Sequence, residues 1–316
     1  MRNVLLLETI ATEALRLLEA DDSIRIFTAY GKKPLNEILA ENQIDAVITR
    51  GKGLINKQLM DSCPNLKVAA RCGVGLDNVD VQEATARKIK VLNTPGANAA
   101  TIAEHTFALM LSLQRNLFRS ISEVKTGNWN WRNQFEGDEI NGKTLGILGL
   151  GNIGTRVAKM ADAFGMKVVY WDKFAKNDDF QYLAFEEVLA VADILTIHLP
   201  LFEETKGLIN ARTLALMKPS AIIINTARGV IIDEIAMYQA LENKTIAGFG
   251  ADVLTIEPPE ANHPLLSHSK ALITAHVGSL TATTYTAMCV LTIEKVLAIL
   301  HHREPDAKSV FNRNEL

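Results

Sequence analysis

Apolar and polar residues alternate along this chain of 316 residues in blocks that predict strands and helices in turn. Short apolar runs end at turn residues, and longer stretches follow in which apolar positions recur at helical spacing. This alternation is typical of parallel α/β folds. The first part of the chain predicts strands at Asn3–Leu7, Ile24–Thr28, Ile44–Thr49, Leu66–Arg71 and Lys90–Leu92. Helical patterns between them cover Thr9–Glu19, Pro34–Glu41, Asn56–Ser62 and Val81–Lys88.

A turn-rich break at Asn93–Asn98 separates this array from a second one. We expect a long helix from about Thr101 to Thr126 after the break, and a long amphipathic helix from about Thr281 to Arg303 near the end. The number and order of the strands between them favour a doubly wound parallel sheet. These strands are predicted at Leu145–Leu148, Val168–Trp171, Ile194–His198, Ala221–Asn225, Ile246–Gly250 and Ala271–Thr274.

The most informative segment is a glycine-rich turn after the first strand of the second array. Gly149 permits a tight turn, Gly151 lets the backbone approach a pyrophosphate, and Gly154 lets the next helix pack closely on the sheet. The N-terminus of that helix offers N–H groups and the positive end of its dipole to phosphates. The turn therefore predicts a dinucleotide site. Its expected contact residues are Gly149, Gly151, Asn152, Ile153 and Gly154.

An acid follows the next predicted strand, where a carboxylate can bind the adenosine ribose of a dinucleotide. Asp172 lies 18 residues after Gly154. Because its negative charge would repel the 2′-phosphate of NADP, the sequence favours NAD as the cofactor. Lys173 is the neighbouring cation that would weaken this preference.

The glycine turn lies in the middle of the chain, and 316 residues exceed the size of one ordinary core. We therefore expect two domains, with ligands bound in a cleft at the carboxyl ends of both sheets. The first is a Rossmann NAD-binding domain at residues 99–285. The second is a smaller, flavodoxin-like α/β substrate-binding domain that combines residues 1–98 with residues 286–316.

Three polar residues follow predicted strands of the second array, at the edge where doubly wound sheets bind ligands. The planar guanidinium of Arg228 is suited to grip a carboxylate. His276 titrates near neutral pH and can exchange a proton, and Glu257 can orient its ring and stabilise the charged form. Each residue alone also fits a structural or surface role. Together with a nicotinamide they are the groups needed for hydride transfer to a 2-oxo acid.

A set of short motifs spreads over nearly the whole chain. They are Arg71–Asn78, Asn93–Gly96, Ala103–His105, Gly142–Gly146, Gly149–Gly154, His198–Pro200, Asn225–Gly229, Asp252–Val253, Glu257–Pro258 and His276. In these motifs the chain resembles the D-isomer-specific 2-hydroxyacid dehydrogenase family. The resemblance implies that Arg228, Glu257 and His276 form the catalytic set.

The resemblance also implies roles for residues outside this set. Asp252 matches the position that holds the nicotinamide carboxamide. Val74 and Gly75 match the backbone N–H groups that bind the substrate carboxylate, together with Arg228 and His276. Further expected cofactor contacts are His198 and Thr226, in matching motifs, and Gly278, two residues after His276.

Within the family the chain most resembles D-3-phosphoglycerate dehydrogenases, through Arg71–Asp80 and Glu139–Gly154. This implies an NAD-dependent D-2-hydroxyacid dehydrogenase, with 3-phosphoglycerate as one substrate and glyoxylate or hydroxypyruvate reduction as the alternative. A phosphate would need further cations, for which Arg50, Lys52 and Arg132 are available. Formate dehydrogenase chemistry needs no proton transfer, so the acid beside the histidine argues against it. An NAD(H)-sensing binding protein is the alternative outside enzymes.

Composition narrows the class of partner. Hydrophobic residues make up 48% of the chain and charged residues 22%, as in ordered globular proteins. A net charge of -3 without a basic segment argues against nucleic acid. No apolar run reaches the length of a membrane span and the first residues do not resemble a signal peptide, so we expect a cytoplasmic protein without a membrane partner.

Cysteine spacing and the family resemblance complete the expectations. Cys63, Cys72 and Cys289 are widely spaced, which indicates buried, reduced thiols and no metal site. The resemblance implies a homodimer that pairs through about Thr101–Arg132. Trp129 and Trp131 in that segment are expected to form a buried contact between subunits.

Overall fold

The computed structural model describes residues 1–316, and the chain divides into two compact units. The terminal unit combines Met1–Asn98 with Leu280–Leu316, and the central unit is Ala99–Ser279. The chain returns from the central unit to the terminal unit at residues 279–280, six residues before the boundary after residue 285 that the sequence predicted. It does so because helix α12 (Ala282–Leu300) is continuous from its N-cap Thr281, so its first turns belong to the terminal unit.

The terminal unit is built on a parallel five-stranded sheet with the order β2-β1-β3-β4-β5. This is the flavodoxin-like order, as the sequence predicted. The strands are β1 (Arg2–Leu6), β2 (Ile24–Thr28), β3 (Ala46–Thr49), β4 (Val68–Arg71) and β5 (Lys90–Leu92). The helices that connect them are α1 (Thr12–Glu19), α2 (Leu35–Glu41), α3 (Lys57–Asp61) and α4 (Val81–Ala86).

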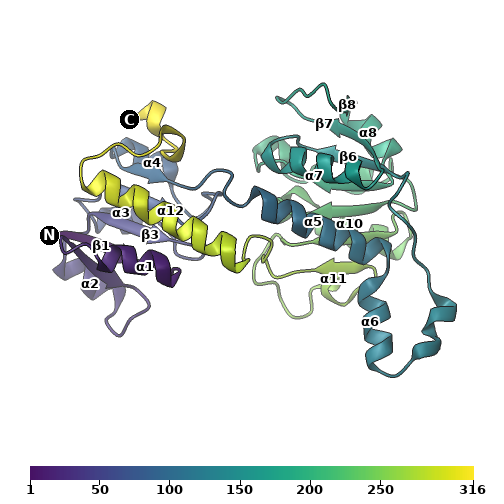
Figure 1. The fold of residues 1–316 in the computed structure, drawn as a ribbon, viewed down its shortest axis with the longest axis horizontal. Helices are drawn as coiled ribbons and strands as arrows, with labels where there is room; N and C mark the ends of the chain where they lie inside the picture. Colours follow the sequence, from purple (N-terminus) through teal and green to yellow (C-terminus); the bar gives the residue numbers. More distant parts are fainter. The chain divides into compact units, whose positions relative to one another are not determined.

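Helix α12 is long and apolar enough to span a membrane by length and composition alone. The expectation that no segment has this property was therefore wrong. The fold gives the physical reason: α12 lies beside α1 (Figure 1) and buries Met288, Cys289, Ile293 and Val296. A helix that packs into the core of a globular domain has this apolar composition without any contact with lipid.

The central unit is built on a parallel seven-stranded sheet with the order β12-β11-β10-β9-β6-β7-β8. The order reverses between β6 and β9, as in a Rossmann sheet, so the predicted α/β doubly wound class is confirmed. Every residue of β9, β10 and β11 is buried, as expected for strands covered on both faces. The strands are β6 (Thr144–Leu148), β7 (Lys167–Trp171), β8 (Gln181–Tyr182), β9 (Ile194–Ile197), β10 (Ile222–Asn225), β11 (Gly248–Ala251) and β12 (Ala271–Ile273).

Strand β8 was not predicted, because its two residues are exposed and carry no apolar pattern. Helices lie against the sheet of the central unit (Figure 1), and two core clusters of buried apolar side chains hold this unit together. The helices of the unit are α5 (Ala99–Gln114), α6 (Leu117–Lys125), α7 (Asn152–Ala163), α8 (Phe185–Val191), α9 (Ala211–Leu214), α10 (Glu234–Glu242) and α11 (Pro264–Ser267), of which α6 buries no residue.

The single helix expected from Thr101 to Thr126 is instead the pair α5 and α6. Asn116, between them, has a φ of 49°, in the left-handed region where a right-handed helix cannot continue. Asparagine is one of the few residues that tolerate this conformation. The break redirects the chain, so that α6 and the 3₁₀-helix η1 (Trp129–Gln134) extend away from the sheet (Figure 1).

Candidate active site

Two glycines of the predicted dinucleotide turn are required by packing. Gly149 has a φ of 93°, and a Cβ there would lie 2.8 Å from the carbonyl oxygen of His198 on the neighbouring strand end. A Cβ at Gly154 would overlap the carbonyl of Gly149. These contacts hold the turn and the first turn of α7 tightly against the sheet, which is the close packing that the sequence predicted.

Gly151 differs from the other two, because its φ is -73° and a Cβ there would meet no atom within 4 Å. No contact inside the protein therefore requires glycine at this position. Gly151 is also the N-cap of α7, and no side chain caps the N–H groups that open the helix at Asn152 and Ile153. An open approach to unpaired N–H groups fits a pyrophosphate.

Asp172 connects the glycine turn to the end of β7. Its Oδ2 accepts a hydrogen bond of 2.7 Å from the N–H of Leu150, and its Oδ1 accepts from the N–H groups of Phe174 and Ala175 at 2.7 Å each. Lys173 pairs with Glu204, the two charged atoms lying 3.6 Å apart. The carboxylate is thereby fixed beside the turn, and the neighbouring cation has an acidic partner.

His198 directly follows β9, across the reversal point of the sheet from the glycine turn. Its Nε2 lies 3.0 Å from the hydroxyl of Thr196, while its Nδ1 is buried without a hydrogen-bond partner. Burial lowers the pKa of His198 to about 3, so the ring is neutral at physiological pH. At the end of the next strand, the hydroxyl of Thr226 lies 3.0 Å from that of Thr106 in the interior.

Asp252 is a buried acid that organises the segment after β12. Its oxygens accept hydrogen bonds from the N–H groups of Val277 (2.9 Å) and Gly278 (2.8 Å) and from the hydroxyl of Thr274 (2.6 Å). Burial raises its pKa, but these bonds and one from His105, whose Nε2 lies 3.3 Å away, outweigh that effect and lower it. The ionised Asp252 thus fixes the backbone on both sides of His276.

His105 had no role of its own in the sequence analysis. It lies in a matching motif on α5, far from Asp252 in sequence, and only the packing of α5 against the sheet brings the two together. Its Nε2 also lies 3.0 Å from the hydroxyl of Thr274. Spacing along the chain contains no signal for this contact.

Glu257 and His276 form the predicted acid–histidine pair. The Nδ1 of His276 lies 2.7 Å from Oε2 of Glu257, whose Oε1 accepts a bond of 3.0 Å from the N–H of Leu254. The hydrogen bond to Glu257 raises the pKa of His276 against the opposing effects of burial and of the positive charge of Arg228. Burial raises the pKa of Glu257, but the bond from His276 outweighs it and the pKa is lowered.

The backbone of His276 lies in the left-handed region, with a φ of 53°. Histidine is one of the residue types that occur there more often than most, yet the conformation needs support from its surroundings. The N–H groups of the two residues after His276 both donate to Asp252, which supplies that support. The turn directs a half-exposed ring, with 49% of its side-chain surface accessible, out of the sheet edge.

Arg228 follows β10 in a turn that Asn225 holds closed. The side chain of Asn225 donates to the carbonyl of Arg228 at 2.9 Å and accepts from the N–H of Ala227 at 3.0 Å. Gly229 packs directly on the peptide after Leu254, because a Cβ at Gly229 would overlap it. The turn that bears Arg228 and the loop that bears Glu257 are therefore in contact.

Val74 and Gly75 lie in the terminal unit, in the loop after β4. The carbonyl groups of this loop face the protein: Asn93 donates to the carbonyl of Val74 at 2.7 Å, and Arg71 donates to that of Gly75. The N–H groups of Val74 and Gly75 donate to no acceptor in the protein. Paired N–H groups of this kind suit a carboxylate.

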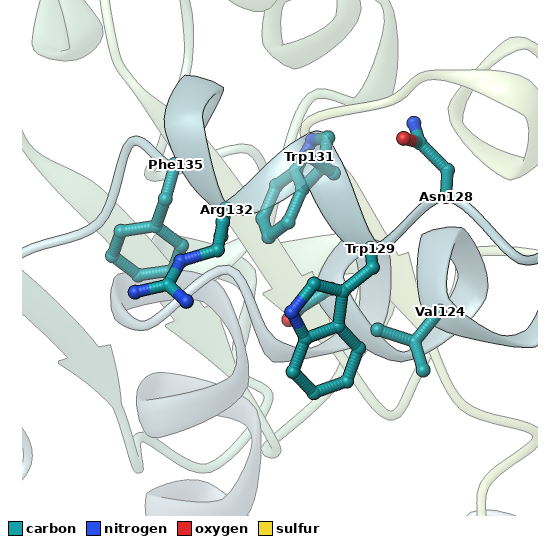
Figure 2. A pocket seen from close by; sticks show the side chains of 7 residues that line it. Val124, Asn128, Trp129, Trp131, Arg132 and Phe135 are labelled. Atoms are coloured by element: carbon teal, nitrogen blue, oxygen red, sulfur yellow. The ribbon is translucent and has the colours of Figure 1, made fainter.

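The predicted phosphate-binding cations lie in different places. Arg50 and Lys52 belong to one loop of the terminal unit, where the guanidinium of Arg50 lies over the ring of Tyr285 at 5.6 Å. Arg132 instead lies in the central unit, on the segment after α6, and lines a pocket of about 340 Å³ with Trp129 and Trp131 (Figure 2).

Trp131 does not behave as expected. It is 4% exposed within its own chain, where it packs edge-on against Phe135 and under the guanidinium of Arg119. A partner subunit is therefore not needed to bury it, and the contact between subunits stays a prediction. Trp129, which is 67% exposed, is available for such a contact.

Residues 107–278 match the model of the D-isomer specific 2-hydroxyacid dehydrogenase NAD-binding domain. The match covers more than half of the chain and contains the glycine turn and the Glu257–His276 pair. The chain belongs to the D-isomer specific 2-hydroxyacid dehydrogenase family. The members of this family are oxidoreductases that act on CH–OH groups, and NAD is the cofactor that the matched domain binds.

Relatives with curated names are similar to this chain over about nine tenths of its length. The chain is 41% identical over 286 residues to a D-3-phosphoglycerate dehydrogenase of Bacillus subtilis (strain 168), covering 89% of this chain and 54% of the relative. It is 37% identical over 289 residues to a hydroxypyruvate reductase of Thermotoga maritima, covering 90% and 94%. The chain thus spans about half the length of the first relative and nearly all of the second.

Solved structures show the same architecture. The TT0316 protein from Thermus thermophilus is 36% identical, with a TM-score of 0.90 over 96% of this chain and 98% of that one. A D-lactate dehydrogenase from Aquifex aeolicus, complexed with NAD and lactic acid, is 27% identical, with a TM-score of 0.84 over 95% and 96%. Both units of this chain, each built on one sheet, therefore have the fold of the family.

Proposed function

We propose that the protein is an NAD-dependent D-2-hydroxyacid dehydrogenase that interconverts a 2-hydroxy acid and its 2-oxo acid. The observation that carries the proposal is the Glu257–His276 pair on the sheet edge of an NAD-binding domain. The Nδ1 of His276 lies 2.7 Å from Oε2 of Glu257. The turn that bears Arg228 packs against the same loop. This combination supplies a proton donor and a carboxylate ligand at one edge of one sheet.

Each catalytic side chain has a defined task in this reaction. His276 donates its proton to the carbonyl oxygen of the 2-oxo acid, and in oxidation it takes the proton from the hydroxyl group. Glu257 stabilises the charged imidazole, so its protonated form persists to higher pH. Arg228 binds the substrate carboxylate and polarises the carbonyl, with the N–H groups of Val74 and Gly75 as further carboxylate ligands.

The residues for NAD follow from the geometry of the glycine turn. The N–H groups at Gly151, Asn152 and Ile153 would hold the pyrophosphate, and Asp172 would accept hydrogen bonds from the adenosine ribose. Bound NAD supplies the hydride acceptor or, when reduced, the hydride donor. The pairing of Lys173 with Glu204 supports NAD over NADP, because it sets an acid against the cation beside Asp172. The remaining contacts are assigned to Gly149, Gly154, His198, Thr226, Asp252 and Gly278.

Two classes of substrate have support. The relative at 41% identity favours D-3-phosphoglycerate. The loop of Arg50 and Lys52 favours the unphosphorylated acids glyoxylate and hydroxypyruvate, because Glu8 already fills its concave row of N–H groups. Oε2 of Glu8 accepts from the N–H groups of residues 50–53 at 2.7 to 3.0 Å. Burial raises the pKa of Glu8, but these bonds outweigh it and lower it to about 2.

NADH consumption by the purified protein tests the proposal and ranks the substrates. The panel is glyoxylate, hydroxypyruvate, phosphohydroxypyruvate, pyruvate and larger 2-oxo acids. We expect turnover with at least one of them and its loss in His276→Ala. Absence of turnover across the panel, with NADH still bound, would contradict the enzyme and leave the NAD(H)-sensing alternative.

We also propose that the protein is a homodimer that pairs through α6 and the segment after it. No residue of α6 is buried, although the helix carries four large apolar side chains. These are Leu117, Phe118, Ile121 and Val124, and they are between 43% and 68% exposed. An exposed apolar face of this kind is typical of a contact surface, and its last residue, Val124, lies beside the exposed Trp129 (Figure 2). Light scattering should give a dimer mass, and Phe118→Glu with Ile121→Glu should give a monomer.

The free, buried cysteines support the predicted cytoplasmic location.

A further inference from the structure

The loop that carries Glu257 has little support of its own. Among residues 255–262, all but Pro259 are exposed, and Ile256 is exposed to 71%. Exposed loops with few packed side chains open easily. A carboxylate that must lie 2.7 Å from the Nδ1 of His276 therefore needs the two ends of this loop to be held in place.

One side chain from outside the loop reaches both ends. Glu234, in the first turn of α10, accepts a hydrogen bond of 2.6 Å from the N–H of Thr255, where the loop begins. Its other oxygen lies 3.2 Å from Nε2 of His263, where the loop ends. The side chains of Glu234 and His263 are only 15% and 20% exposed, so water competes weakly for these bonds.

The peptide held by Glu234 is also the junction of the catalytic loops. Gly229, next to Arg228, packs on the peptide between Leu254 and Thr255. The N–H of Leu254 donates to Glu257 at 3.0 Å, and the N–H of Thr255 donates to Glu234. A shift of the backbone at these two adjoining peptides would therefore move Glu257 relative to both His276 and Arg228.

We propose that Glu234 is a positioning residue that clamps the Glu257 loop at both ends and so sets the protonation of His276. The proposal rests on the proposed function for its effect on catalysis, but the clamp itself is a structural property. Helix α10 offers a matched control at its other end. Glu242, the last residue of α10, lies 3.1 Å from Nε2 of His268, which follows α11 and lies outside residues 255–263.

Amide hydrogen exchange in the full-length protein tests the clamp without reference to activity. In Glu234→Ala, we expect exchange in residues 255–263 to rise about tenfold, the effect of losing a charged hydrogen bond. Glu234→Gln keeps an acceptor for the N–H of Thr255 and should restore most of the protection at that end. Glu242→Ala should exchange like the wild type in this loop.

Steady-state kinetics with NADH test the consequence for His276. Because Glu257 raises the pKa of His276, loosening the loop should move the alkaline limb of the reduction rate to lower pH. We expect kcat to fall about tenfold in Glu234→Ala while KM for NADH stays near the wild-type value. Glu234→Gln should recover part of both effects, and Glu242→Ala should show neither.

The outcomes separate the clamp from the reaction. Wild-type exchange in the loop together with a wild-type pH profile in Glu234→Ala would overturn the proposal. If that variant does not fold, His263→Ala tests the clamp instead. It removes only the contact between His263 and Glu234 at the end of the loop, and should raise exchange near residues 260–263. A wild-type enzyme without turnover would contradict the proposed function, while the exchange data would still decide the clamp.

Discussion

Two histidines at the carboxyl edge of the same sheet lie in opposite environments. His276 follows β12, is half-exposed and pairs with Glu257, which raises its pKa. His198 follows β9, has a buried Nδ1 without a partner, and burial lowers its pKa to about 3. Both follow a parallel strand of the central sheet in sequence. The comparison teaches that the position after a strand brings a histidine to the ligand edge, whereas its partners decide whether it can carry a proton.

The largest effect should come from removing the proton donor. His276→Asn keeps a residue that tolerates the left-handed backbone of this position but cannot titrate. We expect kcat for 2-oxo acid reduction to fall about 10³-fold, because general acid catalysis is lost. His268→Asn, in the same unit and away from Glu257, is the control and should retain most of the activity. A His276→Asn enzyme with near wild-type kcat would remove the proposed acid.

A smaller effect should come from removing only the charge of the partner. In Glu257→Gln, an acceptor remains near Nδ1 but the negative charge is gone, so the raised pKa of His276 should return toward its ordinary value. We expect kcat to fall about 10- to 100-fold and the alkaline limb of the rate profile to move to lower pH. Glu260→Gln, which changes an exposed acid in the same loop, should leave the profile in place. An unshifted limb in Glu257→Gln would show that the pair does not set the titration.

The smallest effect should appear in stability and have the opposite sign for the two histidines. The pKa of His198 is lowered to about 3 from 6.5, so between these values the unfolded chain binds a proton that the folded chain does not. Stability therefore falls as the pH drops below about 6.5. The raised pKa of His276 stabilises below its ordinary value, and that contribution is lost as the pH rises through the folded value.

Thermal unfolding between about pH 7 and pH 5 checks this sign. His198→Asn should lose less stability on acidification than the wild type, by on the order of 1 kcal/mol. His276→Asn should not reduce the loss. Parallel curves for the wild type and His198→Asn would mean that His198 is not held neutral by the fold.

Local patterns predicted much of this molecule. The terminal unit's strands and helices agree with the apolar periodicity to within a few residues at their ends, and the glycine turn lies where its strand and helix predicted. The features that these patterns did not predict have identifiable causes. Asn116 breaks the expected long helix through its backbone conformation, and β8 is two exposed residues that pair only because β7 is beside them. Trp131 is buried within its own chain because Phe135 and Arg119 pack against its ring.

Residue patterns along the chain were enough to predict the doubly wound class and the glycine turn, and to nominate Arg228, Glu257 and His276 as the catalytic set, because glycine geometry and strand-end chemistry are local properties. How these groups are held in place depends on the folded arrangement of the chain. His105 on Asp252 and Glu234 on both ends of the Glu257 loop are contacts between segments distant in sequence. Such contacts depend on how helices pack on the sheet, and residue spacing along one chain does not contain that information.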